Sequence, residues 1–354
     1  MKTINLIDTI GVETGMHKYN EAFVTLCKKE GVKVNVISNY NDKNVTLLLH
    51  NYYRGCILKR INYLLYDFFR LLIYEMKNKE QYYIYQSFGF RIIDILFFIP
   101  LIFNSKSYLL IHDLFELNVL NKSDRLRLVK KILYKKIKRY ICHSILVKND
   151  LEKIIAYRSH KIILIPHFEY TYATDYNSNN IPLAVKSVFA SRLVNVLFFG
   201  QVSKTKGVDI LLEAFPSLNK NINVIIAGVD KSDILLNYTQ NERLHFISRY
   251  IEDEELNFLF SNCDIVVMPY REIYQSGVLE TVIHFQKPVI MSSVKSFWEY
   301  KLKYPSFGEC YHPNTPESLA NCINDFDLNK NYYSKTDIIN YNKEHSINIL
   351  LQQL

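Results

Sequence analysis

A short loop in the second half of the chain carries residues suited to binding phosphate groups. It runs from Gly200 to Gly207, between an apolar strand pattern and a helical pattern, and it contains Lys204 and Lys206. Backbone N–H groups near the start of a helix bind anions, and lysine side chains add positive charge. The loop therefore predicts a diphosphate site at a strand-to-helix turn.

A second stretch, residues 263–290, combines groups that suit phosphates with groups that suit hydroxyls. Glu272 lies in a loop after an apolar strand pattern, and Ser276 and Gly277 open a helical pattern that contains Glu280. Amide groups at a helix start, aided by the helix dipole, suit phosphate oxygens. Glu280, one turn further on, is placed to accept hydrogen bonds from ribose hydroxyls, and Glu272 from the hydroxyls of a sugar.

Two common nucleotide-binding motifs are absent from the glycine-bearing loops at 9–16 and 200–207. Neither loop fits the G-x-G-x-x-G fingerprint of dinucleotide-binding oxidoreductases or the G-x-x-x-x-G-K-[ST] loop of P-loop NTPases. The histidines show no metal-ligand spacing, and the Asp-x-Asp formed by Asp325 and Asp327 falls late in the chain. We therefore expect no metal site and no cofactor.

An alternation of strands and helices, which begins anew in each half, positions these loops. In the first half the pattern predicts a strand over 4–7, a helix over 17–29 and a strand over 32–37. Further strands are expected at 82–85, 108–111, 144–147, 162–165, 196–199, 224–227, 245–247, 265–268 and 288–291. This order predicts an α/β fold with two doubly wound, Rossmann-like domains, whose ligands bind beyond the carboxyl ends of the strands.

The domain boundaries follow from the same pattern and from a polar, asparagine-rich stretch in the middle. We expect an N-terminal domain over 1–170, a linker over 171–190, a C-terminal domain over 191–331 and a tail over 332–354 that packs back on the N-terminal domain. A length of 354 residues exceeds what one hydrophobic core usually serves, which also favours two domains.

Composition narrows the class of protein. Hydrophobic residues make up 49% and charged residues 22% of the chain, which is ordinary for a globular enzyme. The six cysteines form no CxxC pair, which argues against a disulfide scaffold and favours a reducing compartment. The longest apolar run, residues 95–103, is shorter than the roughly 20 residues that span a membrane. We therefore expect a cytoplasmic protein.

Positive charge is concentrated in residues 122–139, which hold nine Lys or Arg residues and one Asp, while the rest of the chain is neutral. Leu126, Val129 and Leu133 recur at helical spacing and predict an amphipathic helix there. That helix either packs on a sheet with its lysines in water or rests on an anionic membrane surface, at the inner face of the cell membrane. Nucleic acid is not expected as a partner, because no nucleic-acid-binding motif accompanies the charge.

The order of these motifs resembles that of a known enzyme family. The second half resembles the retaining nucleotide-sugar glycosyltransferases of family 4, which have the GT-B fold. The resemblance rests on four features: GQVSKTKGVDILLEAF (200–215), CDIVVMPY (263–270), Glu272 and Glu280 with seven residues between them, and KPV (287–289). The first domain is similar more loosely, through GVETGMHKY (11–19), LLIHDL (109–114), SILVKND (144–150) and IILIPHFEY (162–170). The resemblance implies two Rossmann-like domains that face each other across a cleft.

The resemblance also implies roles for individual residues, among which His112, Glu272 and Lys206 are the expected catalytic ones. Lys206 would neutralise the donor diphosphate, Glu272 would hold the donor sugar, and His112 would lie near the transferred sugar. Ser276 and Gly277 would hold the phosphates through their backbone, Glu280 would bind the ribose, Gly15 would approach the donor from the first domain, and the base would lie along Arg249, Tyr250 and Ile251. The expected donor site is completed by Gly200, Gln201, Lys204 and Val278.

Two departures from the family's pattern bear on the donor site. Gln201 stands where the family usually has arginine, and Lys204 is placed to compensate for it. The glycine pair that usually follows the strand at 288–291 is replaced by SVKSFWEY, residues 293–300.

The function implied by the resemblance is transfer of a hexose from a nucleoside-diphosphate sugar to a glycan, lipid-linked or protein-linked acceptor, in the synthesis of cell-surface polysaccharide or glycoconjugate. The reaction is expected to retain anomeric configuration and to need no metal, because lysine charge and a helix start can stabilise the leaving diphosphate. Two alternatives share the fold: a catalytically degenerate protein that binds a nucleotide sugar or acts as a scaffold, and a nucleotide-sugar epimerase.

Overall fold

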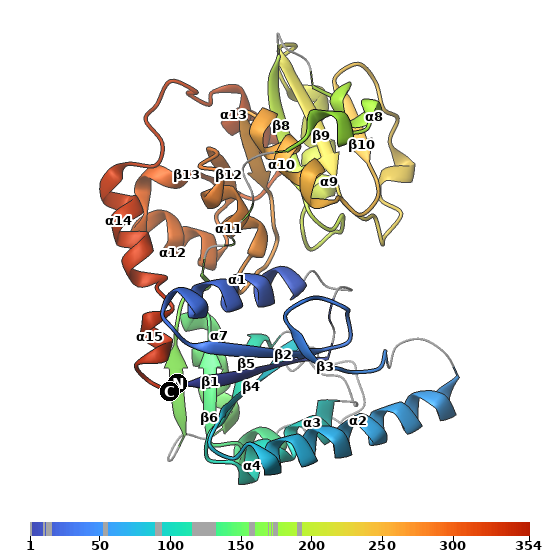
Figure 1. The fold of residues 1–354 in the computed structure, drawn as a ribbon. Coiled ribbons are helices and arrows are strands. Elements are labelled where there is room, and N and C mark those ends of the chain that lie inside the picture. The colour runs from blue at the N-terminus through green and yellow to red at the C-terminus, as the bar shows by residue number, and fades with distance from the viewer. Residues whose placement is uncertain are drawn as a thin grey trace. The chain divides into compact units, whose positions relative to one another are not determined.

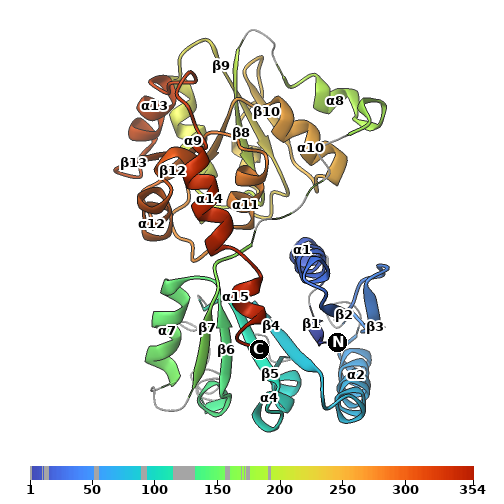
Figure 2. The same cartoon turned by 60° about the vertical axis from the view of Figure 1, so that its left-hand side comes forward.

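The chain folds into two compact units, one of residues 1–168 with 344–354 and one of residues 169–343. The computed structural model describes residues 2–9, 11, 16–51, 56–88, 94–114, 132–155, 160–168, 170, 172, 176–189 and 193–354. Each unit is built on one parallel sheet (Figures 1 and 2). Among the described residues, no helix is both long enough and apolar enough to cross a membrane.

The first unit has a seven-stranded sheet in the order β3-β2-β1-β4-β5-β6-β7. Its strands are β1 (Thr3–Asp8), β2 (Lys33–Ser38), β3 (Val45–Leu48), β4 (Tyr82–Phe88), β5 (Ser107–Asp113), β6 (Arg139–Cys142) and β7 (Lys161–Leu164). Its named helices are α1 (Met16–Lys29), α2 (Ile57–Lys77), α3 (Asp94–Phe98), α4 (Pro100–Phe103), α7 (Ile145–Ile155) and α15 (Asn348–Leu351). Because α1 and α2 cover opposite faces of the sheet (Figure 1), the central strands are buried on both sides.

The second unit has a six-stranded sheet in the order β10-β9-β8-β11-β12-β13. Its strands are β8 (Val194–Phe199), β9 (Ile222–Ala227), β10 (Leu244–Ile247), β11 (Ile265–Met268), β12 (Val289–Ser292) and β13 (Gly308–Tyr311). Its helices include α8 (Leu183–Lys186), α9 (Val208–Ala214), α10 (Asp253–Asn262), α11 (Gly277–His284), α12 (Lys295–Lys303), α13 (Pro316–Asn324) and α14 (Lys335–Glu344). Figure 2 shows α10 on one face of the sheet and α9 with α13 on the other. The strands β9 and β11 are buried along their whole length, as continuous apolar runs in parallel sheets are.

The predicted fold class, two parallel-sheet α/β domains, is confirmed, but one predicted strand is wrong. Residues 144–147 open α7, and the strand is β6, a few residues earlier. Ser144 explains the difference, because its hydroxyl accepts a hydrogen bond from the Val147 amide at 3.2 Å, the bond that a residue capping a helix start makes. The edge strands β3 and β13 were not predicted.

The end of the chain is shared between the units. Residues 332–343 belong to the second unit and residues 344–354 to the first. Lys2 Nζ donates to the Leu351 carbonyl at 2.6 Å, and Lys161 Nζ donates to the Gln353 carbonyl. The stretch predicted as a linker, 171–190, lies within the second unit, where it contains α8.

The basic segment 122–139 lies mostly outside the described residues. Residues 132–136 are helical, and Arg139 begins β6. Leu133 and Ile137 are buried, so this end of the segment packs on the first unit.

Candidate functional site

The two predicted phosphate-binding stretches of the second unit lie side by side. Their strands, β8 and β11, pair directly in the sheet, so both stretches begin at the same sheet edge. The Arg271 amide donates to the Thr205 carbonyl at 2.9 Å, and a Cβ on Gly200 would lie 3.3 Å from Val278 Cγ2. The fold thus brings the lysine-bearing loop, 200–207, against the start of α11.

Arg271 holds these two stretches together and was not predicted. Its guanidinium binds Asp209 at both carboxylate oxygens, at 2.6 and 2.9 Å, and donates to the Lys204 carbonyl at 2.5 Å. Hydrogen bonding to Asp209 raises the pKa of Arg271 further above its ordinary value. The sequence gives no signal for this contact, because 62 positions separate the two residues.

Gly207 is required where the loop meets the segment after β11. Its φ is +66°, and a Cβ there would lie 1.9 Å from the Pro269 carbonyl oxygen. A side chain would therefore be strained and would also collide with backbone. The approach of the two stretches depends on glycine at this position.

Lys206 is placed for a role in anion binding. Its Nζ lies 3.9 Å from the centre of the Tyr270 ring, within cation–π range. Partial burial lowers the pKa of Lys206 to about 8. The negative charge of a bound anion would favour the charged amine and so offset that desolvation cost. Lys204 and Gln201, by contrast, are exposed.

The loop's own amides are less available than expected. The amide of Lys206 donates to the Ser203 carbonyl at 3.1 Å, and that of Gly207 donates to the Lys204 carbonyl at 3.0 Å. The loop therefore offers a ligand mainly the charge of its lysines.

The start of α11 has the predicted form. Ser276 is the N-cap, and its hydroxyl accepts from the Leu279 amide at 3.3 Å. A Cβ on Gly277 would lie 2.9 Å from the Tyr170 hydroxyl, so a bulky side chain does not fit there. Val278 is half-buried against Gly200. The first amides of this helix lie beyond its internal hydrogen bonds, as at every α-helix N-terminus.

The two predicted carboxylates lie in different environments. Glu272 is exposed, as a sugar-binding carboxylate in a loop can be. Glu280 is only 2% exposed, and its two oxygens accept from the hydroxyls of Tyr300, at 3.4 Å, and Tyr341. The Glu280 carboxylate is thus satisfied inside the unit by α12 and α14, and its expected ribose role stays a prediction.

The predicted base-binding residues also differ from one another. Arg249 donates to both carboxylate oxygens of Glu255, at 2.7 and 2.6 Å, which ties it to the start of α10 and raises its pKa. Ile251 is buried, and Tyr250 is 46% exposed. Of the three, Tyr250 therefore has the side chain most accessible to a planar base.

His112 lies at the carboxyl edge of the first sheet among other buried histidines. It is 6% exposed, and its ring lies edge-on to Tyr19, with 4.9 Å between ring centres. Burial, with His143 and His167 nearby, lowers the pKa of His112 well below its ordinary value. The ring is therefore neutral near pH 7. Gly15 lies outside the described residues.

A chain of buried amides fixes the proton on His112. Asn20 Nδ2 donates to the Asp8 carboxylate at 2.8 Å, and Gln86 Nε2 donates to Asn20 Oδ1 at 2.7 Å. Gln86 Oε1 then lies 3.1 Å from His112 Nε2. Because Asn20 donates through Nδ2 to Asp8, its oxygen accepts from Gln86 Nε2, and the Gln86 oxygen is left facing the ring. His112 therefore carries its proton on Nε2.

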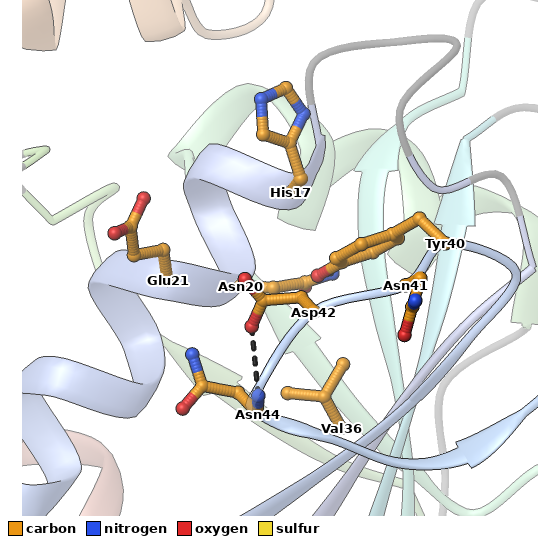
Figure 3. Close-up of a pocket in the computed structure, with 8 residues that line it drawn as sticks. All are labelled: His17, Asn20, Glu21, Val36, Tyr40, Asn41, Asp42 and Asn44. Atoms are coloured by element: carbon orange, nitrogen blue, oxygen red, sulfur yellow. Dashed lines mark hydrogen bonds between the residues drawn. The ribbon is translucent and has the colours of Figure 1, made fainter.

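A pocket of the first unit was not predicted (Figure 3). Its volume is about 290 Å³, and it lies between α1 and the segment that follows β2. The lining residues are His17, Asn20, Glu21, Val36, Tyr40, Asn41, Asp42 and Asn44. Asn20 Nδ2 donates to the Tyr40 hydroxyl at 3.2 Å, and burial raises the pKa of Tyr40 to about 12. Amide, carboxylate, imidazole and phenol side chains therefore line one small pocket.

The amino-acid sequence of the second unit is similar to that of known glycosyltransferases. Residues 185–345 match the family model of glycosyl transferases group 1. The match covers most of the second unit and no more than the last residues of the first. A GDP-mannose:glycolipid 4-beta-D-mannosyltransferase of Xanthomonas campestris pv. campestris is 26% identical to the chain over 134 residues, which are 36% of this chain and 35% of that protein. The match thus spans about a third of the relative's length.

Solved structures share the whole fold with this chain. A sucrose-phosphate synthase from Thermosynechococcus elongatus has 16% identity and a TM-score of 0.71, with 100% of this chain and 97% of that chain covered. Anabaena Alr3699/HepE in complex with UDP and glucose has 14% identity and a TM-score of 0.65, with 100% and 98% covered. The GT-B fold is therefore confirmed, whereas family 4 within the group 1 type stays a prediction.

Proposed function

We propose that the protein is a glycosyltransferase that moves a hexose from a nucleoside-diphosphate sugar to a glycan, lipid-linked or protein-linked acceptor. The observation that carries the proposal is the contact between the loop 200–207 and the start of α11. A cation and a helix N-terminus meet there, and both favour a diphosphate. The group 1 type of this unit supports the same assignment.

In the proposed reaction the bond between the sugar's anomeric carbon and the diphosphate oxygen breaks, and negative charge develops on the leaving group. An acceptor hydroxyl oxygen forms the new bond to the anomeric carbon and gives its proton to the leaving diphosphate. Lys206 and the amides of α11 stabilise that charge, so no metal ion is needed in this scheme. Glu272 binds hydroxyls of the donor sugar. For neutral His112 we keep the role that the resemblance implies, a contact with the transferred sugar. Retention of anomeric configuration and a cytoplasmic site of action belong to the same proposal.

Titration of Lys206 gives the proposed reaction a pH dependence. Because its pKa in the free protein is lowered to about 8, the amine loses its charge above about pH 8. We expect kcat/KM for the donor to fall above that pH, since kcat/KM reports groups of the free enzyme. Arginine keeps its positive charge at all assay pH values, so Lys206→Arg should show no fall in kcat/KM within the range of the assay. A flat profile between about pH 7 and pH 9 in the wild type would contradict the role of Lys206.

The pocket of the first unit is proposed as part of the acceptor site. Its amides and carboxylates can exchange hydrogen bonds with sugar hydroxyls, and the Tyr40 ring gives an apolar face to a pyranose. Tyr40→Ala is expected to raise the acceptor KM roughly tenfold, with the donor KM unchanged. Tyr40→Phe keeps the aromatic ring and should raise the acceptor KM by less than Tyr40→Ala does. An equal rise in the donor KM would contradict the assignment of this pocket to the acceptor site.

A donor panel tests the function itself. The relatives point first to GDP-mannose and UDP-glucose with a glycolipid acceptor, because those molecules occur in their names. Release of GDP or UDP with a glycosylated product supports a transferase. Tight binding without release would support a degenerate binding protein, and conversion of the donor to its epimer would support an epimerase.

A further inference from the structure

Helix α2 presents an apolar face to solvent. Large apolar side chains recur along it at intervals of three and four residues, and each is between 41% and 75% exposed. They are Leu58, Ile61, Leu65, Phe69, Ile73 and Met76. Such spacing places them along one side of a helix. On most surface helices of globular proteins this apolar side faces the core.

The inward side of α2 carries acidic residues. Asp67 is fully buried and accepts from the His50 amide at 2.7 Å and from Arg70 at 3.0 Å. Glu75 is buried too, where it accepts from the Tyr85 hydroxyl and, at 3.3 Å, from Asn104. Leu71 is fully buried on the same side, so polar and apolar contacts together anchor the helix, and the exposed apolar side chains are left for another partner.

Two elements next to the helix also expose large apolar side chains. Leu48 is 51% exposed, and its carbonyl accepts from the Arg70 guanidinium at 3.1 Å. Phe103 is 82% exposed and directly precedes Asn104, which contacts Glu75. The neighbouring elements β3 and α4 thus also carry exposed apolar side chains. Large exposed apolar patches mark protein or membrane contacts.

Charge distinguishes these two kinds of partner. Within α2, whose residues the structure describes throughout, both acidic side chains are buried. Lys59 and Lys77 are exposed at the two ends of the helix. A second copy of the chain on this face would bring like charges together, whereas anionic lipid headgroups would pair with the lysines.

We propose that α2 lies on the surface of an anionic lipid bilayer, with its apolar side among the outer acyl segments and its lysines at the phosphates. The helix is not apolar enough to span a bilayer, so it lies in the interface plane. This contact is independent of the proposed catalytic activity and of the basic segment 122–139.

Vesicle sedimentation of the full chain tests the proposal. We expect binding to phosphatidylcholine vesicles that contain about a third phosphatidylglycerol, and weaker binding to phosphatidylcholine alone. The double variant Leu65→Ser/Phe69→Ser should bind the anionic vesicles at least about tenfold more weakly. The matched control, Leu302→Ser/Ile339→Ser, removes two apolar side chains of the second unit that are each 65% exposed, and it should bind as the wild type does.

Circular dichroism of each variant checks that the fold is kept, and Phe69→Trp gives a second reading. Its indole emission should shift to shorter wavelength when anionic vesicles are added.

Wild-type binding by the α2 double variant, or no binding by the wild type, would overturn the proposal. A loss confined to Lys135→Gln/Lys136→Gln would assign the membrane contact to the basic segment instead. A dimer in solution that the α2 double variant dissociates would assign the face to a second copy.

Discussion

Replacing Lys206 by alanine is expected to lower kcat/KM for the nucleotide-sugar donor about a hundredfold or more. The amine is the partly buried cation of the loop 200–207, it lies over the Tyr270 ring, and its loop contacts the segment that leads into α11. Loss of one group that stabilises developing negative charge typically costs a factor of about 10² to 10³. Initial rates over a range of donor concentrations measure the effect.

Lys204→Ala is the matched control for this prediction. It removes the same charge from the same loop, but the side chain is exposed and solvent screens it. We expect a loss of no more than a few-fold. Equal losses in the two variants would show that the loop acts only through its general positive charge.

Gly207→Ala is expected to destabilise the second unit by about 2–5 kcal/mol and to abolish donor binding. A left-handed conformation costs an L-residue about 1–2 kcal/mol, and the forced displacement of the Pro269 carbonyl adds about 1–3 kcal/mol. That displacement also separates the loop 200–207 from the segment before α11. Hydrogen exchange in increasing urea measures the free energy of unfolding of the second unit separately from that of the first. Calorimetry with UDP and GDP measures donor binding.

Gly31→Ala separates strain from collision. Gly31 has a similar φ of +71°, but a Cβ there would meet nothing within 4 Å. The substitution should therefore cost only the strain of about 1–2 kcal/mol and leave donor binding intact. If Gly207→Ala were no more destabilising than Gly31→Ala, the contact with Pro269 would not matter for stability.

The fold was largely predictable because its strands are continuous apolar runs separated by helical patterns. The failures have local causes. At residues 141–147 an apolar run contains both the end of β6 and the start of α7, and only the hydrogen bond of Ser144 separates them. The edge strand β3 was missed because it is only four residues long, with alternate residues exposed. Hydrophobic pattern alone does not report either feature.

The candidate site was predictable where chemistry is local to a motif, and less so where it depends on distant partners. The glycine and lysine of the loop and the N-cap of α11 follow from neighbouring residues. The burial of Glu280 depends on Tyr300 and Tyr341, which come from later helices. The amide chain from Asp8 to His112 joins three different strands and α1, so no spacing rule would find it.

The outward apolar side of α2 shows a further limit of pattern analysis. Helical spacing predicts an amphipathic helix but not which side meets the sheet. Here Asp67 and Glu75 face inward because His50, Arg70, Tyr85 and Asn104 satisfy them. Leu71 is buried on the same side, so these hydrogen bonds and one buried leucine together accompany the orientation.

A crystal structure of the full chain with bound UDP or GDP tests the central claim most directly. The account predicts that the diphosphate lies within hydrogen-bond distance of Lys206 Nζ and of the first amides of α11. A diphosphate bound at any other place on the chain, with the loop 200–207 and α11 unoccupied, would contradict it.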